Sequence, residues 1–168
     1  TDGVSFTPAS TQTYTVTGTD GNGCQNTDQV TVTVGANLSV NAGQNQSVCQ
    51  GQSVTLTATG ASGYVWDNGV TNGVSFTPAS TQTYTVTVSD AVGCSATDQV
   101  TVTVNSIPNI NAGSNQAICP GGSVILSGSG GTSYTWNNGV TNGVSFNPAA
   151  TQTYTVTGTD ANGCSNTD

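Results

Sequence analysis

Short runs in which apolar residues alternate with threonine or serine recur along the whole chain. Residues 100–104 read Val-Thr-Val-Thr-Val, and residues 53–58 and 84–88 alternate in the same way. A period of two is the pattern of a strand with one buried face, and no run shows the period of an amphipathic helix. Glycine, proline, asparagine and aspartate separate the runs, as expected for turns. The pattern therefore predicts short strands throughout.

The alternating runs belong to a sequence repeat. Residues 3–17 read GVSFTPASTQTYTVT, residues 73–87 are identical, and residues 143–157 read GVSFNPAATQTYTVT. This spacing of 70 residues is too long for one coil of a solenoid, and about six or seven short strands in such a length are typical of a small sandwich. We therefore expect an all-β chain of tandem small antiparallel immunoglobulin-like β-sandwich domains of period 70, arranged end to end.

The repeat frame is offset from the start of the chain. Residue 1 corresponds to residue 71, so we expect residues 1–36 to be the C-terminal half of a first repeat. Residues 37–105 would be a complete repeat, and residues 106–168 a third repeat that lacks its last strand. The links at 34–38 and 104–108 are too short for a free tether. They predict repeats held nearly end to end. Because both ends of the sequence fall inside a repeat, we expect it to be a piece of a longer protein.

Aromatic residues supply the predicted core. Tyr64 and Trp66 flank Val65, and threonine replaces that valine in the next repeat. We expect the two aromatic side chains on the buried face and the residue between them outside. A strand tryptophan and a tyrosine near the start of a later strand are core features of immunoglobulin-like sandwiches. Val74 should also point inward. The expected core anchors are Trp66, Trp136, Phe6, Phe76, Phe146, Tyr14, Tyr84 and Tyr154.

The composition excludes several classes of function. The chain has no Lys, Arg, His or Glu, and its eight acidic residues, all Asp, give a net charge of −8. Nucleic-acid binding needs cations opposite the phosphates, so we exclude a nucleic-acid partner. General acid–base catalysis draws mainly on the absent residue types, so we expect no enzyme and no catalytic residue. No apolar run reaches the roughly 18 to 20 residues of a membrane span, so we expect no membrane insertion.

The five cysteines recur with the repeat in two series, Cys49 with Cys119, and Cys24 with Cys94 and Cys164. They lack the clustered spacing of a metal site, whereas small domains in oxidising compartments often use disulfides. Our first pairing is within each repeat, Cys49–Cys94 and Cys119–Cys164, with Cys24 bonded to a partner outside the sequence. The rival is Cys49–Cys164, between neighbouring repeats. It arises because Cys49 and Cys94 fall at opposite ends of a simple sandwich, and bonded Cα atoms lie within about 7 Å.

An acidic loop raises the question of calcium. Residues 20–28 read DGNGCQNTD, and spaced Asp and Asn oxygens suit a hard cation. The corresponding loop at 90–98 reads DAVGCSATD, with Val92 in place of Asn22. A site used in every repeat should keep its ligands. We therefore interpret the segment as a hairpin loop with Asx turns and expect no cofactor and no metal ligand. Calcium between domains is the alternative that this comparison leaves unsupported.

Five segments carry a family resemblance: CQGQSVTLTA at 49–58, YVWDNG at 64–69, FTP at 76–78, TYTVT at 83–87 and DAVGC at 90–94. Together they resemble the tandem PKD-like and immunoglobulin-like repeats of large Bacteroidota cell-surface adhesins, most closely the SprB-type gliding-motility adhesins. The resemblance implies an extracellular or cell-surface filament, exported by type IX secretion and used in adhesion or gliding. It implies no active site in the repeats. The WDNG of the second segment departs from the longer Trp-x-Phe-Gly-Asp-Gly usual in PKD domains.

We therefore expect a structural repeat segment of a long extracellular adhesin or surface filament. Its partners would be neighbouring repeats of the same chain, and lateral copies of the filament through strands that lack lysine guards. A tip outside this sequence would bind a surface polysaccharide or substratum. Two alternatives remain open. The repeats could bind polysaccharide through Tyr64 and Trp66, or they could form an accessory array of a secreted hydrolase.

Overall fold

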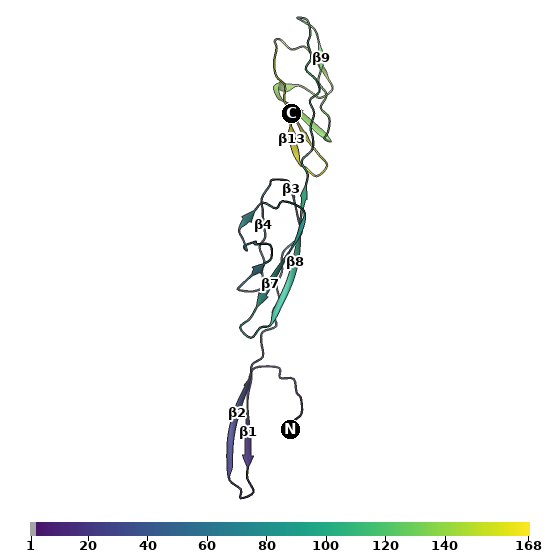
Figure 1. The fold of residues 1–168 in the computed structure, drawn as a ribbon. Coiled ribbons are helices and arrows are strands. Elements are labelled where there is room, and N and C mark those ends of the chain that lie inside the picture. Colours follow the sequence, from purple (N-terminus) through teal and green to yellow (C-terminus); the bar gives the residue numbers. More distant parts are fainter. Residues whose placement is uncertain (1–2) are drawn as a thin grey trace. The chain divides into compact units, whose positions relative to one another are not determined.

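Strands dominate the computed structural model, which describes residues 3–168 (Figure 1). One short 3-10 helix, η1 (Asn137–Gly139), is the only helical turn in this described part. No helix among these residues is long and apolar enough to cross a membrane. The strands form several sheets, most of them antiparallel. The chain is therefore all-β, and its small sheets fit a β-sandwich architecture.

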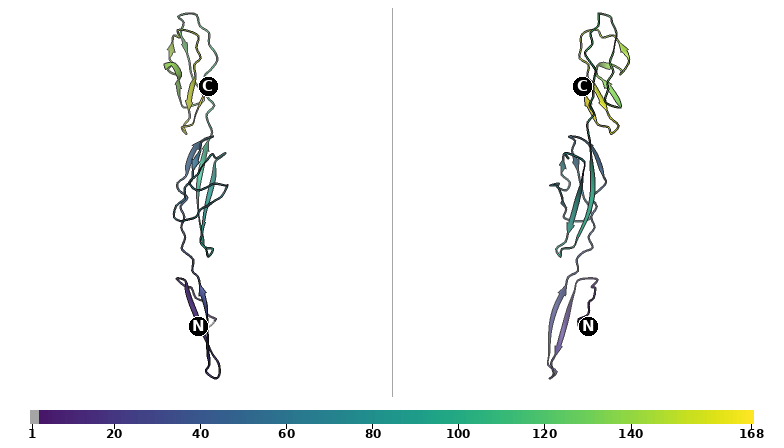
Figure 2. Two further views of the ribbon diagram at one scale, coloured as in Figure 1. Left: turned by 90° about the vertical axis from the view of Figure 1, so that its left-hand side faces the viewer. Right: turned by 45° about the vertical axis from the view of Figure 1, so that its right-hand side comes forward.

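The chain divides into two compact units, and Figure 2 shows their strands from two further sides. The first unit comprises the described residues up to Gly43, Leu56–Val74 and Tyr84–Val100. The second comprises Gln44–Thr55, Ser75–Thr83 and Thr101–Asp168. Both units thus draw on the predicted complete repeat, residues 37–105.

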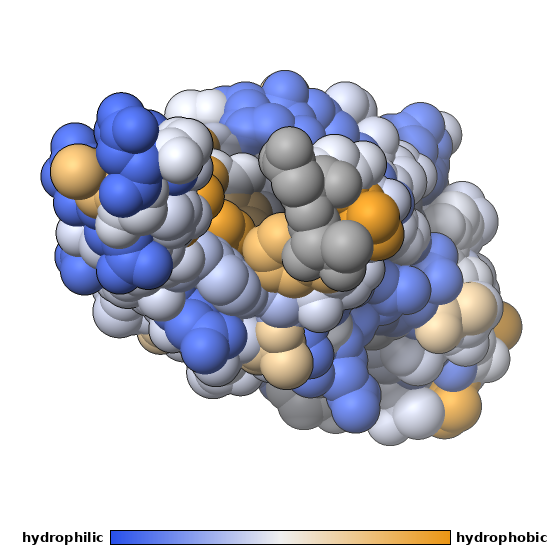
Figure 3. All heavy atoms as spheres, turned by 90° about the horizontal axis from the view of Figure 1, so that it is seen from below, coloured by the Kyte–Doolittle hydropathy of each residue, from blue (hydrophilic) through white to orange (hydrophobic). Residues whose placement is uncertain are grey.

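The first unit contains a long antiparallel hairpin of β1 (Gln12–Thr19) and β2 (Gln25–Val32). Backbone pairs run without a break from one end of the hairpin to the other. Its alternate apolar residues nevertheless remain in solvent, with Val16 65% and Val30 62% exposed. Figure 3 shows apolar side chains, in orange, at the surface of the molecule. The hairpin therefore forms its backbone ladder without burying its apolar face.

The segment from Gln46 to Asn105 contributes a four-stranded and a two-stranded sheet, in the orders β3-β8-β7-β5 and β4-β6. All of its neighbours with a described register are antiparallel except β3 and β8, which are parallel, with Cys49 opposite Asn105. This pair corrects the expectation of wholly antiparallel sheets. The strands are β3 (Gln46–Cys49), β4 (Val54–Thr55), β5 (Val65–Trp66), β6 (Ser75–Phe76), β7 (Gln82–Ser89) and β8 (Ser95–Asn105).

The C-terminal segment, within the second unit, repeats part of this pairing. A three-stranded antiparallel sheet has the order β10-β12-β13, and β11 pairs with β9. The β9–β11 pair lies one sequence period after the β4–β6 pair, and the bridge Asn111↔Ser129 lies one period after Asn41↔Thr59. The strands are β9 (Val124–Ile125), β10 (Ser133–Trp136), β11 (Ser145–Phe146), β12 (Val156–Thr159) and β13 (Ser165–Thr167).

Burial follows the alternation of the sequence where a second layer of strands is present. Along β7, Tyr84, Val86 and Val88 are buried while the residues between them are not. Burying one valine completely contributes about 1.5 to 3 kcal/mol. The buried apolar residues of the segment 42–102 are Ala42, Val54, Leu56, Ala58, Trp66, Tyr84, Val86, Val88, Val100 and Val102. In the C-terminal segment Ile110, Trp136 and Val156 form the cluster, with Ala112, Leu126, Tyr134, Val140 and Tyr154 packed against it.

The predicted core anchors fall into three groups. Trp66, Trp136 and Tyr84 are buried, which confirms their assignment. Burial raises the pKa of the Tyr84 hydroxyl, and the neighbouring Asp67 carboxylate raises it further. Phe76, Phe146, Tyr14 and Tyr154 are of intermediate exposure. None of the four is fully buried: Tyr154 packs against the C-terminal cluster, whereas Tyr14 belongs to the hairpin of β1 and β2, which has no buried core in the described residues.

Two of the inward predictions are wrong. Phe6 is 61% exposed, because the hairpin of β1 and β2 has no facing sheet in the described residues. Its ring forms a T-shaped pair with that of Tyr14, with 5.0 Å between the centroids. Val74 is 54% exposed. Its backbone N–H donates to the carbonyl of Thr71, so it lies in a turn where the period of two does not apply.

Candidate functional site

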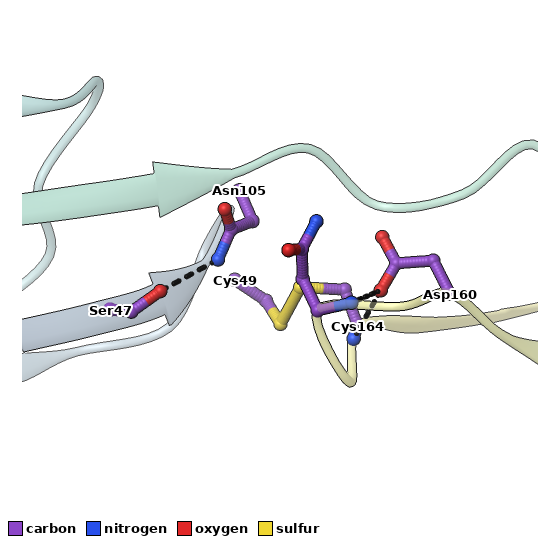
Figure 4. The surroundings of a disulfide bond; sticks show 6 residues. Ser47, Cys49, Asn105, Asp160 and Cys164 are labelled. Carbon is purple, nitrogen blue, oxygen red and sulfur yellow. Dashed lines mark hydrogen bonds between the residues drawn. A yellow bond between two sulfur atoms is a disulfide. The ribbon is translucent and has the colours of Figure 1, made fainter.

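A disulfide bond joins Cys49 to Cys164 across the boundary between two consecutive copies of the sequence repeat (Figure 4). The two Cα atoms are 5.6 Å apart, and 115 residues of sequence separate them. Both cysteines belong to the second compact unit. Cys24, Cys94 and Cys119 are exposed free thiols. The bond is the rival pairing of the sequence analysis, and the first pairings, Cys49–Cys94 and Cys119–Cys164, are not formed.

Strand β8 gives the physical reason for this correction. Cys49 lies opposite Asn105, the last residue of β8, whereas Cys94 directly precedes Ser95, its first. A strand rises about 3.3 Å per residue, so the two ends of this 11-residue strand lie roughly 30 Å apart. A disulfide needs Cα atoms within about 7 Å of each other. Cys49 therefore cannot reach Cys94 without breaking the sheet.

Backbone and side-chain hydrogen bonds hold Cys49 in place. Beyond the β3–β8 pairing, the N–H of Gln50 donates to the carbonyl of Asn105 over 2.8 Å. The Asn105 amide donates to the Ser47 hydroxyl, also over 2.8 Å (Figure 4). A tight turn follows, in which Gln52 N–H donates to the Cys49 carbonyl and Gly51 adopts a φ of 84°. The cysteine thus sits at the end of a braced strand.

An aspartate shapes the loop that carries Cys164. One carboxylate oxygen of Asp160 accepts the N–H groups of Asn162 and Cys164, each over 2.9 Å (Figure 4). Asp20 and Asp90 close their own hairpins with the same two contacts. The acidic loop is therefore a hairpin closed by an aspartate side chain. Among the residues the structure describes, no three His, Cys, Asp or Glu side chains gather as a metal site.

Two of these hairpins, those of Asp90 and Asp160, contact the links that precede their repeats. Within the second unit, the Asn166 amide donates to the Pro108 carbonyl over 3.1 Å. Within the first unit, the N–H of Ala36 donates to a carboxylate oxygen of Asp90 over 3.0 Å. Beside that contact, a Cβ added to Gly35 would overlap Cys94 Sγ. Each hairpin loop with its cysteine therefore rests on a link between repeats.

The fold lowers the pKa of two aspartates, Asp90 in its hairpin loop and Asp98 in strand β8. For Asp90, burial raises the pKa, but backbone N–H donors, led by Cys94 and Ala36, outweigh it and bring the pKa below its ordinary value. For Asp98, hydrogen bonds from the N–H groups of Ala42 and Gln99 lower the pKa against a smaller opposing effect of burial. Both carboxylates are thus favoured in the charged form by the fold.

The side chains of Trp66 and Trp136 lie in the protein interior. The indole N–H of Trp66 donates to the Asn72 side-chain oxygen over 3.1 Å, and Trp136 does the same to Asn142 over 2.9 Å. Trp66 is 6% exposed, and Val65 beside it is 70% exposed, which confirms the predicted orientation of this segment. A sugar ring needs an open aromatic face for stacking. The buried Trp66 does not offer one.

Sequence reasoning missed two sets of hydrogen-bond acceptors, Asn72 with its counterpart Asn142, and Asp98 with its counterpart Asp168. Asn72 accepts both the Trp66 indole N–H and the backbone N–H of Ala58. Asp98 accepts the N–H of Ala42, and Asp168 accepts that of Ala112 in the same way. The available signal was their recurrence at the repeat period, but a polar residue in a turn gives no hint of its partner. Strand β3 was also missed, because its sequence QSVC does not alternate.

No protein-family model matches this sequence, and no curated protein is detectably similar to it. The functional argument therefore depends on the residues and their contacts.

Proposed function

We propose that this chain is a structural repeat segment of a long extracellular adhesin or surface filament, a stalk or fibre for adhesion or gliding. In this proposal each copy of the repeat is an immunoglobulin-like β-sandwich, and the copies are arranged end to end. The Cys49–Cys164 bond carries the proposal, because it ties one copy covalently to the next. An isolated domain needs no such bond.

The path of mechanical load supports a role in bearing tension. The disulfide closes a loop over a separation of 115 residues, so a pull along the chain passes from Cys49 directly to Cys164. Residues between the two cysteines are shielded from extension even if their sandwiches open. This arrangement limits the length that a stretched filament can gain.

The chemistry of the chain supports an extracellular location. Disulfides persist in oxidising compartments and are rare where thiols are kept reduced. The absence of Lys and Arg leaves no cleavage site for trypsin-like proteases, which suits long exposure outside the cell. We propose the cell surface or a secreted filament as its location, with neighbouring copies of the repeat as its principal partners.

Immunogold labelling of intact, unpermeabilised cells tests this proposal. An antibody raised against the folded chain should mark thin surface filaments at many points along their length, because the epitope recurs with the repeat. Labelling that requires permeabilised cells would contradict it. Binding of soluble polysaccharide by the folded chain, with label in amorphous material and not on filaments, would favour the polysaccharide-binding alternative.

A further inference from the structure

We propose that Cys94 is one half of a second disulfide between repeats. Its partner would be the counterpart of Cys49 on a strand that adds in parallel to residues 32–35, supplied by a preceding copy of the repeat. The inference deepens the proposed function, since it makes the inter-repeat bond a recurring element and not a single event. Its evidence comes from the register of β3 and from the position of Cys94.

The register of the observed bond can be transferred by one repeat. Strand β3 pairs in parallel with Val102–Asn105, which places Cys49 opposite Asn105. Gly35 occupies the position one sequence period before Asn105. A strand equivalent to β3 beside residues 32–35 would therefore place its cysteine opposite Gly35.

The thiol of Cys94 lies at this same place. A Cβ built on Gly35 would overlap Cys94 Sγ and would lie 2.7 Å from a carboxylate oxygen of Asp90. The hydrogen bond from Ala36 N–H to Asp90 holds the hairpin loop against the link. These residues all belong to the first compact unit. The equivalent hairpin cysteine, Cys164, is bonded in this structure and has no exposed surface.

The hairpin of β1 and β2 presents an apolar face that the half-repeat carrying such a strand would cover. Val16 and Val30 are exposed, whereas their counterparts Val86 and Val100 are 0% and 1% exposed. Strand β2 ends at Val32, while β8 continues past the equivalent Val102 to Asn105, along its pairing with β3. The occupant that fits this surface is therefore the N-terminal half of a repeat, the counterpart of residues 37–66.

The same rule accounts for the other free thiols. The observed separation of 115 residues equals the distance in sequence from Cys49 to Cys94 plus one period of the repeat. Cys24 would accordingly bond a cysteine that precedes it by this same separation, and Cys119 a cysteine that follows it by the same separation. Neither position falls inside this sequence.

Bond formation follows thiol–disulfide exchange. The Cys94 thiolate attacks the sulfur of a partner cysteine that carries a small-molecule thiol such as glutathione in a mixed disulfide. The Cys94–partner bond forms, the mixed disulfide breaks, and glutathione leaves as its thiolate. The mixed disulfide is the oxidant, so two electrons and all atoms balance.

A peptide with the sequence of residues 44–58, QNQSVCQGQSVTLTA, supplied as its glutathione mixed disulfide, tests the proposal on the full chain with Cys49–Cys164 intact. Strand addition raises the local peptide concentration to the millimolar range, so at about 0.1 mM peptide Cys94 should be modified roughly tenfold faster than Cys24 or Cys119. Peptide mapping reports each site. Equal modification of the three thiols would overturn the proposal.

Two controls separate strand addition from simple exposure. A peptide in which Cys49 and Ser47 are exchanged keeps the composition but moves the thiol to the earlier position, and it should lose the preference for Cys94. The Val30→Asp variant should lose it as well, because its charge lies on the face to be covered. A preference that persists in both controls would overturn the proposal. A negative result would overturn only the second disulfide. The filament proposal is tested separately, by the immunogold labelling.

Discussion

The same stretch of sequence behaves differently in two parts of this molecule. Residues 3–17 and 73–87 are identical, and β1 and β7 begin and end at corresponding residues. Yet Val16 is 65% exposed and Val86 is 0% exposed. The hairpin needs only its own residues to form its backbone ladder. A core forms where residues 37–66, or their counterparts one period later, supply the second layer.

The two copies also differ in their position relative to the disulfide. Residues 3–17 lie outside the loop that the bond closes, and residues 73–87 lie inside it. When the oxidised chain is pulled from its ends, residues before Cys49 should extend, and those enclosed by the bond should not. At about 3.5 Å per residue, the separation of 115 residues hides roughly 400 Å of contour length. Force spectroscopy should recover this length on adding a reductant. Cys119→Ser should leave the oxidised length unchanged; equal lengths with and without reductant would contradict the bond.

The second layer can be weakened at its largest side chain. Trp66→Ala should lower the free energy of unfolding by about 3 to 5 kcal/mol, since it leaves a cavity and removes the indole donor from Asn72. Val65→Ala, at the neighbouring position on the exposed side of β5, should change it by less than about 0.5 kcal/mol. Urea unfolding measures both. Similar losses for the two variants would mean that Trp66 is not a core residue.

A matched pair of valines tests the comparison at equivalent positions. Val86→Ala should cost about 1 to 3 kcal/mol, because two methyl groups leave a closed interior. Val16→Ala removes the same groups from an exposed face and should cost less than about 0.5 kcal/mol. Chemical denaturation of the two variants gives the difference. If Val16→Ala proved as costly as Val86→Ala, the hairpin of β1 and β2 would have to be covered in solution.

The smallest expected difference is in the response to acid. The pKa of Asp98 is lower in the folded state than its ordinary value of 3.8, so the folded chain binds fewer protons than the unfolded chain. Its stabilising effect is therefore complete above about pH 5, where the carboxyl is ionised in both states, and is lost as the pH falls through the folded pKa. Asp98→Asn should flatten the decline of stability below about pH 4.

Asp28 provides the matched control for this measurement. It corresponds to Asp98 in the first repeat but accepts the N–H of Gln29 alone, with no equivalent of the Ala42 contact in the described residues. Asp28→Asn removes a carboxylate at the equivalent position without touching the Ala42 contact, and it is the reference variant in the same urea titrations over the acid range. An unchanged profile for Asp98→Asn would show that the Ala42 hydrogen bond does not couple folding to protonation.

The sequence predicted those parts of the structure that depend on local pattern. The alternation of residues 84–88 and 100–104 correctly located β7 and β8, and the order Tyr-Val-Trp correctly placed Trp66 inside and Val65 outside. Local pattern failed at β3, whose QSVC does not alternate, and at Val74, where a turn interrupts the strand. The length of strand β8 then determines which of the two predicted pairings can form, because it separates Cys49 from Cys94. The expected positions of these cysteines at opposite ends of a sandwich already suggested the rival pairing Cys49–Cys164, but residue spacing alone left both pairings open.

The disulfide connectivity of the native protein tests the central claim most directly. The chain lacks Lys and Arg, so trypsin is of no use, but cleavage before each Asp places the five cysteines on five different peptides. Under non-reducing conditions we predict that the peptide of residues 28–66, carrying Cys49, is recovered bonded to that of residues 160–167, carrying Cys164. Recovery of residues 28–66 bonded to residues 90–97, which carry Cys94, would contradict the account.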